Sequence, residues 1–339
     1  MKKGTILSVI MTIFLCCTAF PSVQAKGVQP KELSVVKSLQ YAPSDYRGKE
    51  PLEAVKEKLK PFDIPEAVIR HLPQSKLQKL SEATEISVQS SYYIEPLLPY
   101  QPLVQVDQAT YRAALKKDQI AKAESERRLQ AGAASQASIV LDPSEGLFTD
   151  VNGGKLNLML LLGSADRVNY VMMAIAQWES LPLFRGKDAF GLTRDTDTKV
   201  NEQSASGGYS YFYQIRRPDN TYEDREEFHE VPYVDLAQDK NNHGYAYEFR
   251  LLSDIPSSDD ALRPTTRHTQ VAAFVTYDGY VASSDVRGVN HWATYAHQNI
   301  KIVFDPSFHF DVPFSGGFSM TFGFAWAYTQ KCDEHNWRI

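Results

Sequence analysis

The sequence predicts a mainly β protein, with a C-terminal antiparallel β-sandwich preceded by a small α-helical N-terminal region and a long charged helix. Three observations favour this fold. Runs of alternating apolar and polar residues dominate after residue 138, turn residues separate these runs, and no helix-period run of useful length follows Leu129. Many strands joined by short turns without crossover helices indicate an antiparallel sandwich or barrel.

The first 25 residues have the pattern of an export signal. Lys2 and Lys3 precede an apolar run over residues 6–20, and Val23 and Ala25 occupy the small-residue positions of a cleavage site. We expect residues 1–25 to be a signal peptide cleaved after Ala25. The alternative is a retained anchor, but the run is shorter than the roughly 20 residues of a spanning helix. The mature chain is therefore expected to be secreted and extracellular, with no stable membrane span.

Composition limits the class of protein further. Apolar residues make up 43% of the 339 residues, which favours a folded chain over a disordered one. The formal net charge is -5, and loss of Lys2 and Lys3 with the leader makes it -7. An acidic chain is a poor general binder of nucleic acid and gains no attraction to anionic membranes. No nucleic-acid partner is therefore expected.

Cysteine use is sparse. Cys332 is the one cysteine that remains after residues 1–25 are removed, so the mature chain is expected to hold no internal disulfide. A chain of this size can bury enough core without such links. A cysteine-poor exported chain with a short leader is typical of bacterial secreted proteins. Pairing of Cys332 between chains stays open.

Residues 26–106 are predicted to be mostly helical with one strand. Residues 26–50 are polar and contain prolines, which indicates an extended, mobile leader. Apolar residues then recur at helical spacing in three short helices between residues 52 and 82. Ile86 and Val88 alternate with polar neighbours, which predicts a strand over residues 85–94.

Residues 107–137 are predicted to form a charged helical connector. Asp107 can cap a helix that reaches about Leu129, and its weak apolar stripe leaves much of its surface solvated. Residues 132–138 have the composition of a flexible joint. We place a domain boundary there, with the β-sandwich over residues 138–339.

Several segments after this boundary are predicted strands. Residues 156–162 are almost wholly apolar, which indicates a strand buried on both faces that forms a hairpin with residues 168–178. The sandwich is expected to be organised around Gly317–Tyr328, where bulky residues alternate with small ones. The other candidate strands cover residues 209–215, 229–236, 245–252, 270–280 and 296–304.

Sequence signatures of known catalysts are mostly missing, so the protein is interpreted as a non-enzyme. The chain has no G-x-S-x-G, H-E-x-x-H or G-x-G-x-x-G pattern. An acidic run over residues 223–230 nevertheless supplies three candidate catalytic residues, Glu227, His229 and Glu230. Paired carboxylates can act as general acid and base on a glycosidic bond. The alternative is a solvated, charged face.

Histidines provide the candidate metal ligands. His291, His297 and His309, with nearby aspartates, contain the donor types of a zinc site. The alternative is three hydrogen-bonded interior histidines, and we expect no metal or other cofactor.

Two further patterns are incomplete. Asp195 and Asp197 begin a loop that resembles a calcium loop, but the loop lacks the glycine and the final glutamate. Cys332 and His335 lie three residues apart near the chain end, where a poorly ordered free thiol is expected.

Tyrosines supply the candidate binding residues, Tyr209, Tyr211 and Tyr213. Tyrosine suits carbohydrate faces and protein interfaces because one end is apolar and the other forms hydrogen bonds. The structural alternative is that these rings fill the sandwich. We expect a secreted binding or surface-interaction module with a cell-surface, glycan or protein partner. The alternatives are a secreted polysaccharide hydrolase that uses Glu227 or Glu230 with His229, and a pore former that inserts Gly317–Tyr328.

Overall fold

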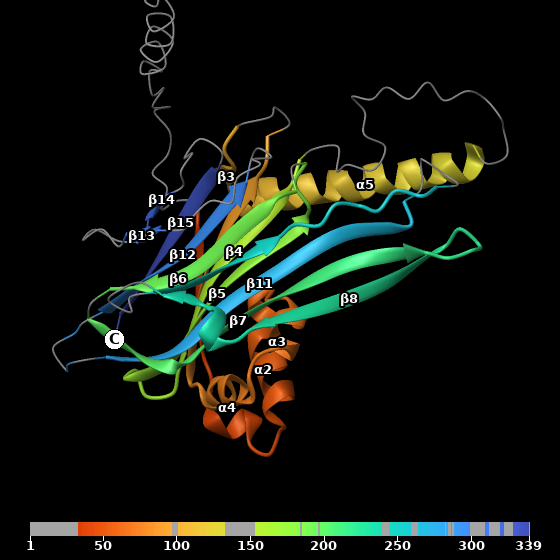
Figure 1. Cartoon of the computed structure of the whole chain (residues 1–339). Coiled ribbons are helices and arrows are strands. Elements are labelled where there is room, and N and C mark those ends of the chain that lie inside the picture. The colour runs from red at the N-terminus through yellow and green to blue at the C-terminus, as the bar shows by residue number, and fades with distance from the viewer. Residues whose placement is uncertain are drawn as a thin grey trace, which may run out of the picture. The chain divides into compact units, whose positions relative to one another are not determined.

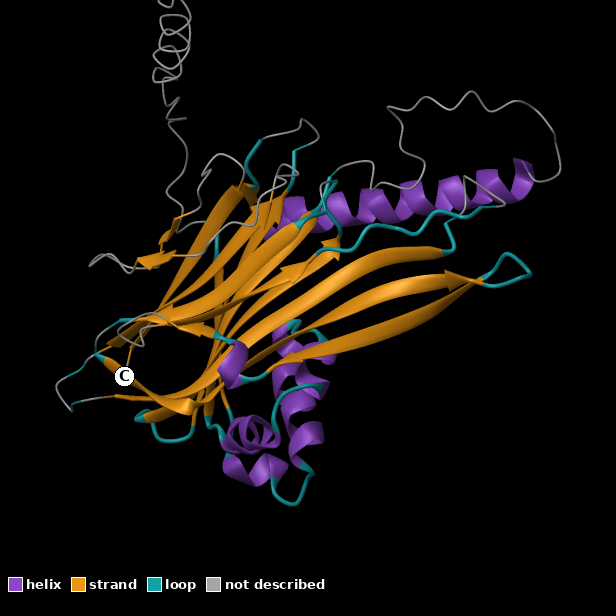
Figure 2. Cartoon of the chain, viewed as in Figure 1, coloured by secondary structure: helices purple, strands orange, loops and turns teal. Residues whose placement is uncertain are grey.

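Two antiparallel β-sheets stacked face to face organise the chain in its computed structural model (Figures 1 and 2). The prediction of a mainly β, antiparallel sandwich is confirmed. The structure describes residues 33–96, 101–132, 153–183, 185–195, 197–238, 244–258, 264–281, 283, 286, 288–298, 309–311, 319–321 and 328–338. The predicted signal peptide lies outside these residues.

The larger sheet has the strand order β1-β2-β4-β5-β11-β7-β8, and β3 also pairs with β2. The predicted hairpin of two long apolar strands is confirmed as β4 and β5, which pair antiparallel. The strands of this sheet are β1 (Val35–Gln40), β2 (Glu85–Ile94), β3 (Val104–Val106), β4 (Lys155–Ser164), β5 (Asn169–Ser180), β7 (Thr198–Arg216), β8 (Tyr222–Val231) and β11 (Thr266–Val281).

The smaller sheet has the order β15-β12-β6-β10-β9, and a separate pair joins β13 to β14. The predicted strand Gly317–Tyr328 falls mainly outside the described residues, apart from β14 and the first residue of β15. The strands are β6 (Lys187–Arg194), β9 (Ala237–Gln238), β10 (Gly244–Arg250), β12 (Gly288–Gln298), β13 (His309–Asp311), β14 (Ser319–Thr321) and β15 (Tyr328–Arg338).

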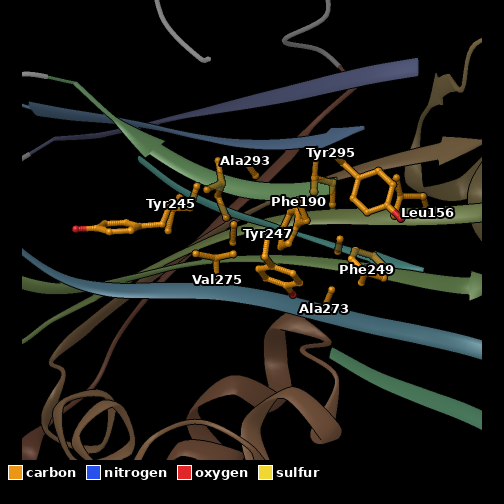
Figure 3. Packing of buried hydrophobic residues seen from close by; sticks show 14 of the residues in the cluster. Leu156, Phe190, Tyr245, Tyr247, Phe249, Ala273, Val275, Ala293 and Tyr295 are labelled. Atoms are coloured by element: carbon orange, nitrogen blue, oxygen red, sulfur yellow. The ribbon is translucent and has the colours of Figure 1, made fainter. Parts of the chain in front are cut away.

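Side chains of both sheets meet in one apolar core (Figure 3). Phe190 and Tyr295 reach it from the smaller sheet, and Leu156 and Val275 reach it from the larger sheet. All four are buried. This shared core holds the two sheets together, because separating them would return its apolar surface to water.

The three short helices expected between residues 52 and 82 cover the other face of the larger sheet (Figure 1). Leu59 and Leu80 on the helices share a buried cluster with Met159 and Leu161 of β4. Since alternate β4 residues face the two cores, the strand must be apolar on both sides. These helices are α2 (Pro51–Leu59), α3 (Glu66–Arg70) and α4 (Gln74–Glu82), with short 3-10 turns η2 (Pro43–Tyr46), η3 (Lys60–Phe62) and, later in the chain, η4 (Tyr233–Asp235).

The long helix α5 (Gln108–Gly132) follows Asp107, whose Oδ1 accepts the Thr110 backbone N–H at 2.9 Å. The helix contacts the sheet through buried Tyr111 and through Asp118, which forms a buried ion pair with Lys155. Residues before and after α5 contribute to the same sheet, because β2 lies between β1 and β4.

Four predictions about individual segments are wrong. Part of the supposedly mobile leader forms β1, whose six residues all pair with β2. The acidic run forms the edge strand β8, which ends at Val231, so a strand over 229–236 is incorrect. The strand expected to begin at residue 296 begins at Gly288 as β12, and residues 299–304 of that prediction lie outside the described residues. The chain end around Cys332 is not frayed: β15 pairs with β12, and its Trp337 is buried in the core.

The contact between the helical layer and the larger sheet can be tested at Leu80 and Gly163. Leu80 is fully buried, and a Cβ added at Gly163 would lie 2.6 Å from its Cδ2 atom. Leu80→Ala should lower the free energy of unfolding by about 2–5 kcal/mol. Gly163→Ala should also destabilise, because its methyl group collides with Leu80. In the double variant that methyl enters vacated space, so urea unfolding should show a loss smaller than the sum. Additive losses would contradict this packing.

Candidate functional site

The three candidate tyrosines lie on the inward face of β7. Strand alternation gives Tyr209, Tyr211 and Tyr213 the same face, and register places His229 beside Tyr209 and Glu227 beside Tyr211. The Tyr209 ring stacks on His229 with centroids 4.9 Å apart, and on Phe249 of the smaller sheet at 5.4 Å. The structure therefore brings two of the sequence-predicted groups, the tyrosines and the Glu227–His229 pair, into contact.

Their exposure separates the three tyrosines. Tyr211 is buried and donates its hydroxyl to the Arg250 carbonyl oxygen at 2.5 Å, whereas Tyr209 and Tyr213 are half-buried. Burial raises the pKa of Tyr209 and of Tyr211, and the nearby Glu227 carboxylate raises both further. Both phenols are therefore neutral hydrogen-bonding groups near neutral pH. Tyr211 therefore belongs to the packed core, while Tyr209 and Tyr213 retain surface that a partner could reach.

A hollow of about 410 Å³ lies against Tyr209, and we name it the Tyr209 hollow. It lies on the side of the sandwich where β8 ends the larger sheet and where β9 pairs with only two residues of β10. Three acidic residues are among its lining residues, and the carboxylate of one of them, Glu248, lies 3.6 Å from the Lys187 ammonium. The lining residues are Ala189, Tyr209, Glu230, Val231, Asp235, Ala237, Ala246, Tyr247 and Glu248.

The candidate catalytic residues occupy both faces of β8. His229 Nε2 lies 3.1 Å from Glu227 Oε1, and both side chains are substantially exposed. Glu230 is three residues from Glu227, so strand alternation turns their side chains to opposite faces. In a glycosidase, one carboxyl group acts as general acid and the other as base or nucleophile, so both must flank the same glycosidic bond. The structure thus brings Glu227 and His229 together and separates Glu227 from Glu230.

The candidate metal ligands are separated along the smaller sheet. His291 and His297 both lie on β12, six residues or about 20 Å apart. His291 Nδ1 lies 3.0 Å from the Tyr277 hydroxyl, and His297 Nδ1 lies 3.1 Å from Asp188. His309 belongs to β13. Within the part of the chain that the structure describes, no three His, Cys, Asp or Glu side chains are grouped to hold a metal ion.

His297 instead belongs to a buried ionic network that sequence reasoning missed. Its Nε2 lies 3.8 Å from Glu95, opposite the Asp188 contact, and Asp188 also accepts the Tyr295 hydroxyl at 2.5 Å. Trp178 Nε1 donates to the same hydroxyl at 2.6 Å. Burial alone would lower the pKa of His297, but Asp188 and Glu95 outweigh burial and raise it to about 9. The imidazole is therefore a buried cation held between two carboxylates.

The loop that resembles an incomplete calcium loop connects β6 to β7 and is held by hydrogen bonds to Asp195. Asp195 Oδ1 accepts the Thr198 hydroxyl at 2.9 Å and the Asp197 backbone N–H at 3.2 Å. Its Oδ2 accepts the Asn290 backbone N–H at 2.7 Å, which ties the loop to β12. Both carboxylate oxygens thus take part in hydrogen bonds within the protein.

Among the described residues, no helix combines the length and the apolarity that crossing a membrane requires. No family model matches the chain. No curated protein matches its sequence.

Several solved structures show a partial likeness to the chain. The collagen-binding domain of a Staphylococcus aureus adhesin has 5% identity and a TM-score of 0.26, and the match covers 51% of this chain and 90% of that one. The collagen-binding subdomain of the Enterococcus faecalis surface protein ACE has 6% identity and a TM-score of 0.23, with 50% and 88% covered. The collagen-binding domain of the Erysipelothrix rhusiopathiae surface protein RspB has 7% identity and a TM-score of 0.21, with 56% and 68% covered. TM-scores this low carry no argument about what the chain binds.

The charge on His297 should make stability depend on pH in a defined direction. Because its folded pKa is raised, its contribution is complete below its unfolded pKa of about 6.5 and is lost as pH rises through about 9. The difference in unfolding free energy between wild type and His297→Gln should therefore shrink from pH 6 to pH 9.5 in urea titrations.

His268 provides a matched control of opposite sign. Burial lowers the pKa of His268, so its contribution is present above about pH 6.5 and is lost as pH falls. The wild-type advantage over His268→Gln should therefore shrink toward acidic pH. A His297→Gln difference that is constant from pH 6 to pH 9.5 would contradict a charged imidazole.

Proposed function

We propose that the chain is an exported, non-enzymatic binding module that takes its partner from the cell surface at the Tyr209 hollow. The observation that carries this proposal is that half-buried Tyr209 lines a hollow on the side of the sandwich where β8 ends the larger sheet. Its volume of about 410 Å³ falls within the usual range of ligand sites, roughly 300–1,000 Å³. The lining of the hollow combines aromatic and acidic residues, which suits an amphipathic or polar partner group.

Contacts around the ring support a preformed site. Tyr209 is packed between strands of both sheets, with Tyr247 and Phe249 from β10 and His229 from β8. Tyr247 is itself fixed, since its hydroxyl donates to the Gly208 carbonyl oxygen at 2.7 Å. A rigid ring loses little conformational freedom when a partner binds, which favours affinity.

Binding is favoured over hydrolysis by the arrangement on β8. Glu227 is an exposed carboxylate paired with an exposed histidine, and Glu230 lies on the opposite strand face. A glycosidase needs two carboxyl groups on either side of one bond. The alternative hydrolase predicts turnover of a polysaccharide that Glu227→Gln abolishes with folding intact, and that result would overturn the non-enzymatic proposal.

Export is the first testable part of the proposal. The charged start, the apolar run and the Val23–Ala25 site predict removal of residues 1–25. When the full chain is expressed in a bacterium with its own leader, intact-mass spectrometry of the medium should find a chain that starts at Lys26. An Ala25→Leu variant should be cleaved poorly. A secreted chain that retains residues 1–25 would contradict cleavage.

The binding surface is tested by co-sedimentation of the purified protein with whole cell-wall sacculi, beside lipid vesicles. Wild type should be retained on sacculi, and Tyr209→Ala should lower the apparent affinity about tenfold because it removes the ring from the hollow. Tyr209→Phe keeps the ring and should retain most of the binding.

Tyr46→Ala is the matched control, because it deletes a partly exposed tyrosine ring from the helical layer. It should leave retention unchanged. Far-ultraviolet circular dichroism establishes that each variant is folded. Equal retention of wild type and folded Tyr209→Ala would remove the Tyr209 hollow as the binding site.

A further inference from the structure

A second and larger hollow, of about 810 Å³, lies at one end of the larger sheet. The C-terminal part of α4, the β4–β5 turn, the start of β7 and the end of β11 surround it. Figure 1 shows α4 beside this end of the sheet. We name it the Tyr280 hollow, and it shares no lining residue with the Tyr209 hollow. We propose that it binds an uncharged glycan, with a sugar ring packed on Tyr280.

The β7 wall of the hollow is a large bulge. Thr276 pairs with Ser206 and Asp278 with Asn201, so five steps along β7 oppose two along β11. Ser204 holds the bulge in place: its hydroxyl donates to the Asn201 carbonyl oxygen at 2.5 Å and accepts the Asp278 backbone N–H at 2.8 Å. Bulges of this kind redirect side chains and are frequent beside functional sites.

The opposite wall and the floor are also fixed by specific bonds. In the β4–β5 turn, Asp166 accepts the backbone N–H groups of Val168 and Asn169 at 2.9 and 2.7 Å. On the floor, Asp278 binds the ammonium groups of Lys76 and Lys79 at 2.5 and 2.7 Å. Three separate segments are thus held in place before any ligand arrives, which lowers the entropic cost of binding.

Tyr280 supplies an accessible aromatic surface. The residue is 44% exposed, an unusual amount for a large ring among the described residues. In the described part of the chain, the Tyr280 ring forms no contact with another ring and its hydroxyl forms no hydrogen bond with another side chain. The apolar C–H face of a pyranose can cover such a ring, while the phenol remains available for a hydrogen bond.

The polar lining selects the class of ligand. Asn201 and Gln203 are exposed amides at the rim, and each amide offers both donor and acceptor atoms, as a sugar hydroxyl does. Carboxylates outnumber ammonium groups: Glu82, Asp166, Glu202 and Asp278 face or line the hollow, against Lys79 and the buried Lys76. A negatively charged sugar would meet net repulsion here, so an uncharged glycan is favoured over an acidic one.

The test is isothermal titration of the purified full chain with neutral trisaccharides of glucose, galactose, mannose and N-acetylglucosamine, beside a galacturonic acid trisaccharide. We expect saturable binding of at least one neutral sugar and at least tenfold weaker binding of the acidic one. Tyr280→Ala should weaken the neutral sugar about tenfold or more, whereas Tyr280→Phe should retain it. Gln203→Ala should weaken it by a smaller factor.

Tyr209→Ala is the matched control, because it removes a tyrosine from the other hollow and should not change sugar affinity. Tyr280 and Gln203 are exposed, so their variants should keep the wild-type melting temperature. The proposal is overturned if no neutral trisaccharide binds, if folded Tyr280→Ala binds as tightly as wild type, or if the acidic sugar binds equally well. Loss of sacculus retention in Tyr209→Ala alone would leave this site intact, so the two proposals fail separately.

Discussion

Two-sided burial of the central strands is the constraint on which the rest of the structure depends. In β4, Leu158 and Leu160 belong to the core between the sheets, and Met159 and Leu161 belong to the core beneath the helices. A strand that is apolar on both faces is stable in water only when a layer covers each face. The smaller sheet supplies one layer and α2, α3 and α4 supply the other. The helices are therefore part of the fold's core, and the chain before α5 also contributes β1, β2 and β3 to the larger sheet.

This constraint leaves the edges and ends of the sheets as places for polar chemistry. The edge strand β8 carries six charged residues and one histidine among its ten, and such edges resist pairing with other chains. The Tyr209 hollow lies beside that edge, and the Tyr280 hollow lies at the ends of β5, β7 and β11. The two hollows are lined by residues of strands that the core between the sheets and the core beneath the helices hold in place. The walls of the hollows can therefore be rigid although the hollows lie at the surface.

Local pattern was enough to predict the class of fold and to select Tyr209 as a binding candidate, but it did not predict either hollow. The alternation and apolarity of β4 and β5 are visible in sequence, as are the helical spacing around Leu59 and the cap at Asp107. The residues of β1 were predicted to be a mobile leader, and β6 was not among the predicted strands. Short strands without clear alternation carry little periodic signal. The Tyr280 hollow could not be predicted, because a bulge in β7 and the register of β11 bring distant segments together. Glu227 and Glu230 look like a pair in sequence, yet a spacing of three in a strand separates them.

The buried ionic network shows what positions the two sheets relative to each other. Apolar packing is nondirectional, so the shared core alone tolerates small shifts between the sheets. Trp178 on β5 of the larger sheet donates to Tyr295 on β12, and Tyr295 donates to Asp188 on β6. His297 then lies between Asp188 and Glu95, the residue that follows β2. Desolvation makes a buried ion pair a weak source of net stability, so we infer that its directional bonds matter chiefly for alignment. Since Tyr209 on one sheet stacks on Phe249 of the other, the geometry of the Tyr209 hollow depends on that alignment.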